Sequence, residues 1–558
     1  MNKRFCKKMC TLSIAAAMLT SLSVSAADNS TGKEGELSTA AIDSVSGHVY
    51  KTEENANPIS PVKFCADPTS VEYNGRLYVY GTSDHEQYEK VGANGENHYG
   101  FIYSLEVFST DDMVNWEYHG SINVKKIAPW IANAWAPSIV SRVEDDGLTH
   151  FYMYFSNNGV GVGVITSTDP VGPWSDPLGK PLVSFNTPGL KNCPNPFDPG
   201  ALIDENGTGW LSLGGGNPGK YKTDIAKIVK LGDDMISFDS DFVGVETPYF
   251  NEASELNYIN GTYVYSYCND WQERKLDVWD YEGIERPHAC SIAYLTSTNP
   301  LDASSWEYKG EYLLNAGDSP DKMDHCNNHS RLQKFKDKWY LIHHTMILRQ
   351  DMKIKGGFRS ICVENVSVDE ENITISLVKP TRAGVSQNGS LNPYLLHSGT
   401  EMFTCADIDF SKKSDGANTS KSLENGSWIN IKGADFTRGA TEFCAEVKGS
   451  GRIEVRLDSV SSQPVAAVDF NADDWQTVKA SSLAKFDSGK HDVYLVFSNS
   501  SIELASWKFT EGEVKETDAS NNNSNGGINI TGIIIVVSVV VVLAAVGVIS
   551  FVLVRKRK

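Results

Sequence analysis

The chain has 558 residues, of which 41% are hydrophobic and 22% charged, and it contains 46 glycines and 10% aromatic residues. This composition excludes a disordered or collagen-like chain, and the length favours several domains. The first 26 residues and the last four each carry four basic and no acidic groups, so residues 27–554 carry a net charge of −28. A body this acidic excludes nucleic acid and anionic membrane surfaces as favoured partners, whereas neutral polymers feel no net repulsion.

The N-terminus has the pattern of a secretory signal peptide. A basic start is followed by an apolar run over residues 12–22 and by small residues at 24–26. This pattern predicts a signal peptide over residues 1–26. Residues 27–60 are rich in Ser, Thr, Glu and Asn without an apolar period, which predicts a linker.

The C-terminus has the pattern of a membrane anchor. Residues 512–529 are rich in Asn, Ser and Gly and predict a flexible stalk. Residues 530–554 are almost wholly apolar, which is long enough for a transmembrane helix, and residues 555–558 form a basic cytoplasmic tail. We therefore expect a secreted body that is anchored to the cell surface by one helix.

Eight cysteines follow the predicted signal peptide, and they are widely spread. No CxxC pair occurs among them, which argues against a zinc ribbon or a thioredoxin-like site. Disulfides are permitted outside the cell. The sequence does not predict which cysteines pair, and it does not predict the oligomeric state.

The central part of the chain contains a weak internal repeat with the pattern of β-hairpins. Five aromatic-rich copies follow each other at intervals of about 65 residues, which suits blades of four strands. The copies lie at residues 73–80, 148–155, 206–213, 260–267 and 336–343. The pattern predicts an all-β fold, with a five-bladed β-propeller over residues 61–385.

Counting back from the repeated aromatic residue finds polar side chains at a similar position. Asp67, Glu252 and His329 lie 11 residues before it and Asp198 lies 12 before it, whereas Trp135 stands at a longer spacing. Because the innermost strands of a propeller surround its axis, we expect these five side chains to meet in one pocket.

Three carboxylates in one pocket indicate acid–base chemistry, because like charges raise each other's pKa. Taken singly, Asp67 and Asp198 precede prolines and suit turns, Glu252 suits an exposed surface, and His329 suits a structural role. Taken together they suit glycoside hydrolysis, which needs a protonated carboxyl group for the leaving oxygen and a carboxylate that activates water or attacks carbon.

Four short motifs resemble glycoside hydrolase family 43. They are Ala66-Asp67-Pro68, Ala134-Trp135-Ala136-Pro137-Ser138, Phe197-Asp198-Pro199-Gly200 and Asn251-Glu252-Ala253-Ser254. The resemblance covers about residues 61–385 and implies a five-bladed propeller of the α-L-arabinofuranosidase, β-xylosidase or arabinanase type. It implies an inverting mechanism in which Asp67 is the general base, Glu252 the general acid and Asp198 the group that adjusts the pKa of the acid.

The same resemblance implies roles for three further residues. His329, in Asn328-His329-Ser330, matches a histidine that helps to hold a calcium ion or its water shell on the axis. Trp135 would pack against the face of the sugar. Arg359 matches an arginine near the sugar in the first subsite.

Residues 401–511, after a connector over residues 386–400, have the alternating pattern of a β-sandwich. They resemble carbohydrate-binding module family 6, a jelly-roll sandwich that stacks sugars on aromatic rings. Trp475 is the candidate sugar platform, and a place in the core is the alternative. Glu503 stands where the family usually has a sugar-binding Asn, so the sequence departs from the pattern there.

Together these features predict an inverting glycosidase that removes arabinofuranosyl or xylosyl residues from arabinoxylan, xylan or arabinan. Two alternatives stay open. One is a non-catalytic surface lectin. The other is a retaining, fructan-cleaving propeller, because Phe197-Asp198-Pro199 half-matches the Arg-Asp-Pro motif of that group, although Ala253 replaces the Cys of its Glu-Cys motif.

Overall fold

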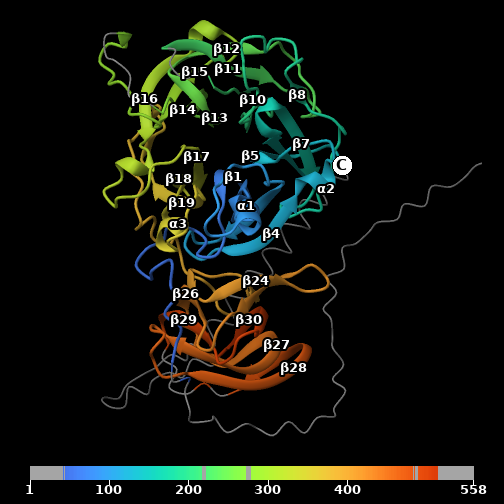
Figure 1. Ribbon diagram of the computed structural model, residues 1–558, viewed down its shortest axis with the longest axis vertical. Coiled ribbons are helices and arrows are strands. Elements are labelled where there is room, and N and C mark those ends of the chain that lie inside the picture. The colour runs from blue at the N-terminus through green and yellow to red at the C-terminus, as the bar shows by residue number, and fades with distance from the viewer. Residues whose placement is uncertain are drawn as a thin grey trace, which may run out of the picture. The chain divides into compact units, whose positions relative to one another are not determined.

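A computed structural model describes residues 42, 44–216, 221–271, 278–481, 483 and 488–512. These residues form the predicted all-β fold of a five-bladed propeller and a sandwich-like sheet (Figure 1). The predicted signal peptide (1–26), nearly all of the stalk, the transmembrane helix (530–554) and the tail (555–558) lie outside the described residues.

Across the part of the chain that the structure describes, no helix combines the length and the apolar character that a membrane crossing requires.

Each propeller blade is an antiparallel sheet whose strands follow the chain order. Blades one and two contain β1 (Ala66–Tyr73), β2 (Arg76–Thr82), β3 (Ser104–Thr110), β4 (Glu117–Asn123), β5 (Trp135–Val143), β6 (Thr149–Ser156), β7 (Gly161–Ser167) and β8 (Val183–Ser184). Blades three and four contain β9 (Gly200–Ile203), β10 (Gly209–Leu213), β11 (Lys222–Lys230), β12 (Val243–Pro248), β13 (Phe250–Ile259), β14 (Thr262–Asn269), β15 (Ile292–Ser297) and β16 (Glu307–Leu313). Blade five contains β17 (Ser330–Phe335), β18 (Lys338–Thr345) and β19 (Ser360–Asn365), followed by the small hairpin of β20 (Val368–Asp369) and β21 (Thr374–Ile375).

The repeated aromatic segments of the sequence are the second strands of the five blades. In blades one and four, two-residue turns precede them, with positive φ at both residues, 53° and 79° at Asn74 and Gly75 and 46° and 83° at Asn260 and Gly261. Asn-Gly favours this conformation, which matches the twist of the flanking strands. The five first strands β1, β5, β9, β13 and β17 contact each other around the axis, as predicted.

The ring is closed by residues from before the first blade. The Ile59 N–H donates to the Ile361 carbonyl (2.9 Å), and the Cys65 N–H donates to the Arg359 carbonyl (2.9 Å), along the free edge of β19. The side-chain oxygen of Asn57 accepts the Val363 N–H (2.7 Å). This segment therefore takes the fourth position in blade five.

Of the predicted linker over residues 27–60, the part that the structure describes (42 and 44–60) packs on both domains. Residues 44–49 pack on the sandwich, where Val49 pairs with Ala406, and Ala56 and Ile59 are buried against the propeller. The described part of the segment forms no regular helix or strand before β1, so its buried side chains follow no apolar period.

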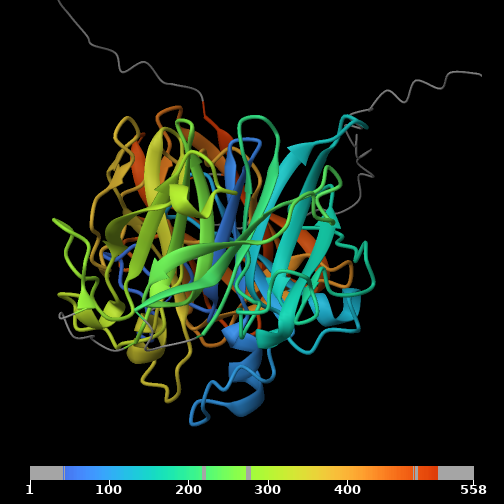
Figure 2. The ribbon, with the colours of Figure 1, turned by 90° about the horizontal axis from the view of Figure 1, so that it is seen from above.

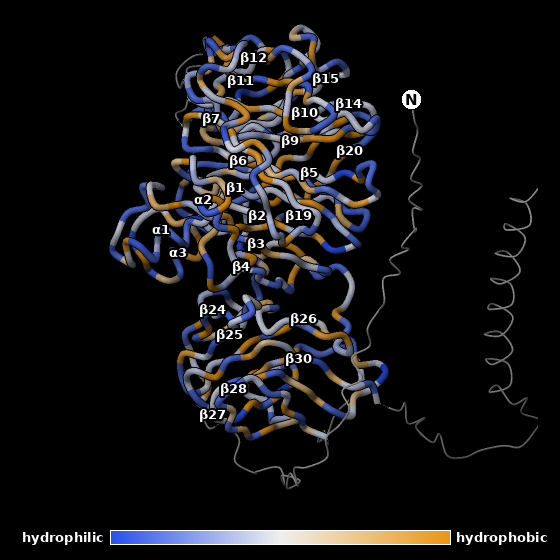
Figure 3. Tube along the Cα trace, turned by 90° about the vertical axis from the view of Figure 1, so that its right-hand side faces the viewer, coloured by the Kyte–Doolittle hydropathy of each residue, from blue (hydrophilic) through white to orange (hydrophobic). Residues whose placement is uncertain are grey.

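Two short helices project from one face of the propeller. α1 (Asp84–Val91) and α3 (Ile347–Asp351) share a small apolar cluster with Phe64 and Phe358. Figure 2 shows α1, in blue, extending beyond the ends of the strands, and Figure 3 shows α1 beside α3. A four-residue helix, α2 (Val124–Ile127), follows blade one.

The second domain is one continuous antiparallel sheet of nine strands that surrounds its own core. Its strands are β22 (His397–Ser398), β23 (Thr404–Ala406), β24 (Ile408–Lys412), β25 (Asn418–Ser422), β26 (Trp428–Asp435), β27 (Ala440–Leu457), β28 (Ala466–Ala480), β29 (Lys490–Phe497) and β30 (Glu503–Glu511). The long strand β27 pairs with β30 along its first half and with β29 along its second half. It therefore belongs to both layers of the sandwich into which this sheet folds.

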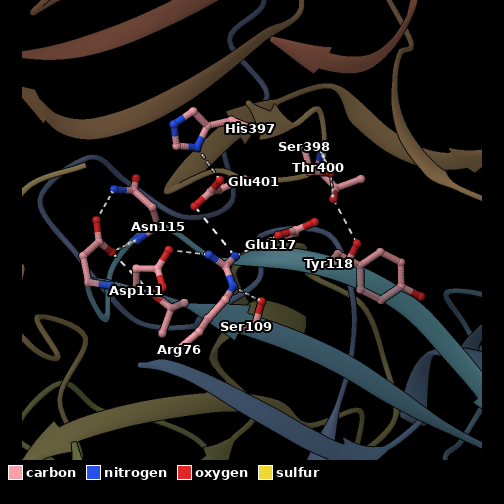
Figure 4. Close-up of polar contacts among 12 residues, drawn as sticks. Arg76, Ser109, Asp111, Asn115, Glu117, Tyr118, His397, Ser398, Thr400 and Glu401 are labelled. Atoms are coloured by element: carbon pink, nitrogen blue, oxygen red, sulfur yellow. Dashed lines mark hydrogen bonds and ion pairs between the residues drawn. The ribbon is translucent and has the colours of Figure 1, made fainter. Parts of the chain in front are cut away.

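Polar contacts join blade one to the second domain (Figure 4). The Arg76 guanidinium donates to Glu117 (2.8 Å), and Glu401 lies 3.9 Å from it on the other side. The Thr400 hydroxyl donates to the Tyr118 carbonyl (2.9 Å). Arg76 and Glu401 are largely buried, so water screens their attraction less than it screens that of an exposed ion pair.

Lys51 is buried where the N-terminal segment meets both domains. Its side chain is 1% exposed, and among the described residues its Nζ atom has no hydrogen-bond partner, although it lies 4.3 Å from the centre of the Phe403 ring. Burial, opposed only weakly by neighbouring thiols, lowers the pKa of Lys51 to about 7.

We expect Lys51→Met to stabilise the protein at pH 6 by a few kcal/mol, and by much less at pH 10. The folded-state pKa lies below the unfolded one, so burying the ammonium costs most below pH 7, and the cost fades as the pH rises towards 10.5. Urea unfolding at both pH values measures this. Lys309→Met is the control, since Lys309 is 33% exposed on β16 and ion-paired with Glu307 (2.8 Å). A gain that is equal at both pH values contradicts the explanation.

Candidate active site

Six of the seven sequence-predicted site residues line one pocket at the propeller axis. The cavity has a volume of about 170 Å³. Its walls are Asp67, Tyr99, Trp135, Ala136, Phe197, Asp198, Glu252, Asn327, Asn328, His329 and Arg359. The exception is Trp475, which lies on β28 of the second domain.

The inner strands are irregular where they border the pocket. The pairing of β1, β5 and β13 with their neighbours shifts register at their first residues, and Asp67, Ala136 and Ala253 adopt positive φ values of 49°, 38° and 61°. Asp198 has the same conformation (49°) just before β9. Bulges of this kind redirect side chains, and strained residues cluster at functional sites.

Glu252 does not occupy the register position that the sequence count assigned to it. Asp67 and Ala253 both lie seven residues before the Asn of their hairpin turns, so Ala253, and not Glu252, is the equivalent of Asp67. Glu252 instead matches Trp135, one residue before the left-handed position. The count from the aromatic residue missed this offset because Tyr263 stands one residue closer to its turn than Tyr78 does.

Asp67 is the carboxylate with the most cationic surroundings. Its Oδ1 accepts from Arg359 (2.8 Å) and its Oδ2 from the Thr82 hydroxyl (2.7 Å). Its own N–H donates to Nδ1 of His344 (3.0 Å), whose Nε2 lies 2.8 Å from the Asn327 carbonyl, so His344 is the neutral tautomer with its proton on Nε2. Burial raises the pKa of Asp67, but Arg359 and the other partners outweigh it and hold the pKa below its usual value.

Arg359 is fixed by a second carboxylate, Asp84, the first residue of α1. Its Nε and Nη2 atoms donate to the two oxygens of Asp84 at 2.9 and 2.8 Å, and its backbone N–H donates to the same group (2.8 Å). Arg359 and Asp84 are 3% and 0% exposed. This bidentate pair aims the remaining Nη1 donor at Asp67.

Asp198 and Glu252, unlike Asp67, lie in surroundings that favour the protonated carboxyl group. Asp198 accepts from the Ala253 N–H (2.9 Å) and the Ser156 hydroxyl (3.3 Å). Burial, followed by the negative charge of Asp67, raises its pKa. Glu252 is half-buried at the pocket wall, and burial and the charge of Asp198 raise its pKa well above the usual value. Glu252 is therefore protonated under conditions where Asp67 is ionised.

His329 does not have the surroundings of a calcium ligand. Its Nδ1 lies 3.7 Å from Asp67, next to the cationic Arg359, and burial lowers its pKa to about 4. Within the described ranges, no three His, Cys, Asp or Glu side chains gather to hold a metal ion. Since calcium prefers several oxygen ligands, the residues here do not fit it. Calcium remains a prediction of the family resemblance.

The two predicted aromatic platforms have different surroundings. Trp135 borders the pocket, and its indole N–H donates to the Tyr99 carbonyl (3.2 Å), which fixes the ring. Trp475 is partly exposed on β28, with the Lys413 ammonium 4.9 Å from its ring centre, so it is not the core residue that the sequence left open. Glu503 begins β30 and accepts from the Thr419 hydroxyl (3.3 Å).

Sequence reasoning missed four residues that shape the pocket, namely Thr82, Asp84, Tyr99 and His344. Thr82 is the last residue of the second strand of blade one and His344 the next-to-last residue of the second strand of blade five, so the repeat that located Asp67 could also have located these two. Asp84 begins a helix and Tyr99 lies in a loop, so both lie outside the repeated strands.

The comparisons with known proteins agree with this geometry. Glycosyl hydrolases family 43 matches residues 55–373, and the carbohydrate binding module (family 6) matches residues 399–511. The chain therefore belongs to glycosyl hydrolases family 43, is a glycosidase and carries a family 6 carbohydrate binding module.

Similar proteins extend over both domains. The chain is 33% identical to an arabinoxylan arabinofuranohydrolase from Paenibacillus polymyxa, over 84% of this chain and 76% of the relative. It is 32% identical to one from Bacillus subtilis, over 82% of this chain and 93% of the relative. A crystal structure of a Bacillus subtilis family 43 arabinoxylan arabinofuranohydrolase with cellotetraose superposes with a TM-score of 0.76, at 31% identity, covering 83% of this chain and 99% of that one.

We expect Thr82→Val to move the acid limb of the pH profile of hydrolysis upward by about one unit. The hydroxyl donates to Asp67 and so lowers its pKa. Without it the pKa of Asp67 rises, and ionised Asp67 is lost at a higher pH. The measurement is kcat/KM against pH on an aryl arabinofuranoside.

Thr82→Ser is the matched control, because it keeps the donor and also the acceptor for the Ala136 N–H (2.8 Å). An unchanged acid limb in a folded Thr82→Val protein would show that Asp67 does not titrate in that limb.

Proposed function

We propose that the chain is an arabinoxylan arabinofuranohydrolase, which removes α-L-arabinofuranosyl groups from the xylan backbone by an inverting mechanism. The observation that carries the proposal is the contrast between two carboxyl groups of one pocket, Asp67 with a lowered pKa and Glu252 with a raised one. Pairs whose surroundings separate their pKa values in this way suit acid and base roles. The names of the relatives support the substrate.

In the proposed reaction, ionised Asp67 accepts a proton from a water molecule whose oxygen forms a bond to the anomeric carbon. The bond from that carbon to the xylan oxygen breaks, and Glu252 gives its proton to the leaving oxygen. Water and leaving group occupy opposite faces of the sugar, so the anomeric configuration inverts. The products are free arabinose and a xylan chain that carries a hydroxyl group where the arabinofuranosyl group was attached.

Asp198 and Arg359 support these two groups. Asp198 contributes the negative charge that raises the pKa of Glu252 and so keeps the acid protonated. Arg359 stabilises the Asp67 carboxylate, and a contact of Arg359 with the sugar remains part of the proposal. Trp135 borders the pocket and suits an apolar sugar face.

The proposed location is the outside of the cell, with residues 530–554 as a membrane anchor. The signal-like residues 1–26 and the basic residues 555–558 support this orientation. The carbohydrate binding module would hold the enzyme on polysaccharide, with Trp475 as its proposed sugar contact.

A panel of aryl α-L-arabinofuranoside, aryl β-xyloside, arabinoxylan, arabinan and fructan separates the alternatives. Release of arabinose from arabinoxylan supports the proposal, and release of xylose alone makes the enzyme a xylosidase. Binding of glycan without release of sugar favours a lectin. NMR of the first-formed anomer distinguishes inversion from the retention expected of a fructan-cleaving enzyme.

We expect Glu252→Gln to lower kcat on arabinoxylan by about 10² to 10⁴-fold. The loss should be much smaller on a nitrophenyl arabinofuranoside, because that leaving group departs without a proton. The alkaline limb of the pH profile should also disappear, since activity of the wild type falls as Glu252 loses its proton. Initial rates on both substrates, measured across pH, test this.

Glu307→Gln is the control, because the side chain of Glu307 is 72% exposed on β16. Equal losses on the two substrates would mean that Glu252 is not the proton donor.

A further inference from the structure

Two cysteine sulfurs touch each other directly behind the proposed acid. Cys268 is the ladder partner of Glu252 across β13 and β14. Its Sγ atom lies 3.6 Å from the Sγ atom of Cys290, and both residues are 0% exposed. Among the eight described cysteines, no other two sulfur atoms are in hydrogen-bond contact.

The backbone holds these two residues on one face of the sheet. The ladder between β14 and β15 continues past the strand ends, because the Asn269 N–H donates to the Ser291 carbonyl (3.0 Å) and the Cys290 N–H to the Asp270 carbonyl (2.8 Å). In this register Cys268 and Cys290 are diagonal neighbours on adjacent strands. Side chains in that relation lie on the same face and within reach of each other.

The surroundings make one of the two sulfurs the better nucleophile. A hydrogen bond from Cys268, followed by the His325 imidazole, lowers the pKa of Cys290 to about 6, whereas burial raises that of Cys268 well above its usual value. His325 is exposed and lies beside the Trp271 ring, which is 46% exposed. A cysteine thiolate beside a histidine is the reactive form in thiol chemistry, and because Cys290 is 0% exposed, an external disulfide reaches it only when the structure around the exposed His325 opens locally.

We propose that Cys268 and Cys290 form a thiol–disulfide site, which reacts with low-molecular-weight disulfides and becomes a covalent cross-link behind Glu252. The site goes beyond the proposed hydrolysis, since neither sulfur takes part in it. The cross-link joins the end of β14 to the start of β15.

The reaction is a balanced thiol–disulfide exchange. The Cys290 thiolate attacks one sulfur of the external disulfide, whose S–S bond breaks and releases the first thiol. Cys268 then loses its proton and attacks Sγ of Cys290, which releases the second thiol. Two protein thiols are oxidised to one disulfide, and the external disulfide is reduced to two thiols that carry the two protons.

Oxidation should also change the pKa of Glu252, the proposed acid, because it removes a nearby charge. Asp198, Cys290 and Asp67 raise the pKa of Glu252 and Arg359 lowers it. The cross-link removes the Cys290 thiolate from this set. The alkaline limb of hydrolysis should therefore move to lower pH after oxidation.

The test treats the folded full-length chain with oxidised glutathione and then maps its peptides under denaturing, alkylating conditions. We expect the loss of two thiols and one new peptide pair, Cys268 with Cys290, lighter by two hydrogens. The melting temperature should rise by several degrees, because the cross-link closes a loop over residues 269–289. Dithiothreitol should reverse these changes.

Cys290→Ser and Cys268→Ser should abolish the cross-link and the temperature shift, whereas Cys444→Ser should keep both. The map of the wild-type chain decides the question even if a variant fails to fold. An unchanged thiol count, or a cross-link between other cysteines, in protein that still hydrolyses an aryl arabinofuranoside overturns the proposal and leaves the hydrolytic function intact. A chain that forms the cross-link but hydrolyses nothing keeps this proposal and overturns the function.

Discussion

A buried guanidinium between two carboxylates controls the chemistry of the pocket. Arg359 is held by both oxygens of Asp84, and its remaining donor reaches Asp67. An arginine with a single buried carboxylate would leave its donors partly unsatisfied, whereas here the edge formed by Nε and Nη2 pairs with Asp84 and Nη1 pairs with Asp67. The charge of Arg359 lowers the pKa of Asp67, and the resulting negative charge on Asp67 contributes to the raised pKa of Asp198. The fixed charge of Arg359 thus favours ionised Asp67 and, through Asp67, the protonated form of Asp198.

The same residue ties the pocket to the closure of the propeller ring. The carbonyl of Arg359 accepts the N–H of Cys65, two residues before Asp67, at the seam between blade five and blade one. His344, from the second strand of blade five, accepts the N–H of Asp67 across the same seam. Asp67 is therefore placed by hydrogen bonds that also hold the ring together, so loosening the seam would displace the pocket.

The propeller and the identity of the pocket residues followed from the sequence because repeated strands bring equivalent positions to one axis. Asp67, Asp198 and His329 were found by that logic. Glu252 was found by it with an offset of one residue, because Tyr263, from which the count starts, stands one residue closer to its turn than Tyr78 does. Asp84 and Tyr99 lie outside the repeat, and their importance comes from Arg359, so only the three-dimensional contacts reveal it. The N-terminal segment was missed because its buried side chains, such as Ala56 and Ile59, do not follow a helix or strand period.

That segment has a consequence for how the chain could be divided. Residues 44–49 lie on the sandwich, where the Ser46 N–H donates to the Gly426 carbonyl (2.8 Å), and residues 57–65 complete blade five. The sandwich therefore includes residues 44–49, which lie outside the range 399–511 that the family comparison assigns to it. The propeller includes residues 57–65, which lie at the edge of its range 55–373. Neither domain of this chain is therefore an independent unit that could be exchanged by itself. A sandwich cut from the chain at residue 399 would lose residues 44–49, which cover part of its surface. A recombinant or evolutionary exchange of either domain would have to include the N-terminal segment that contacts both domains.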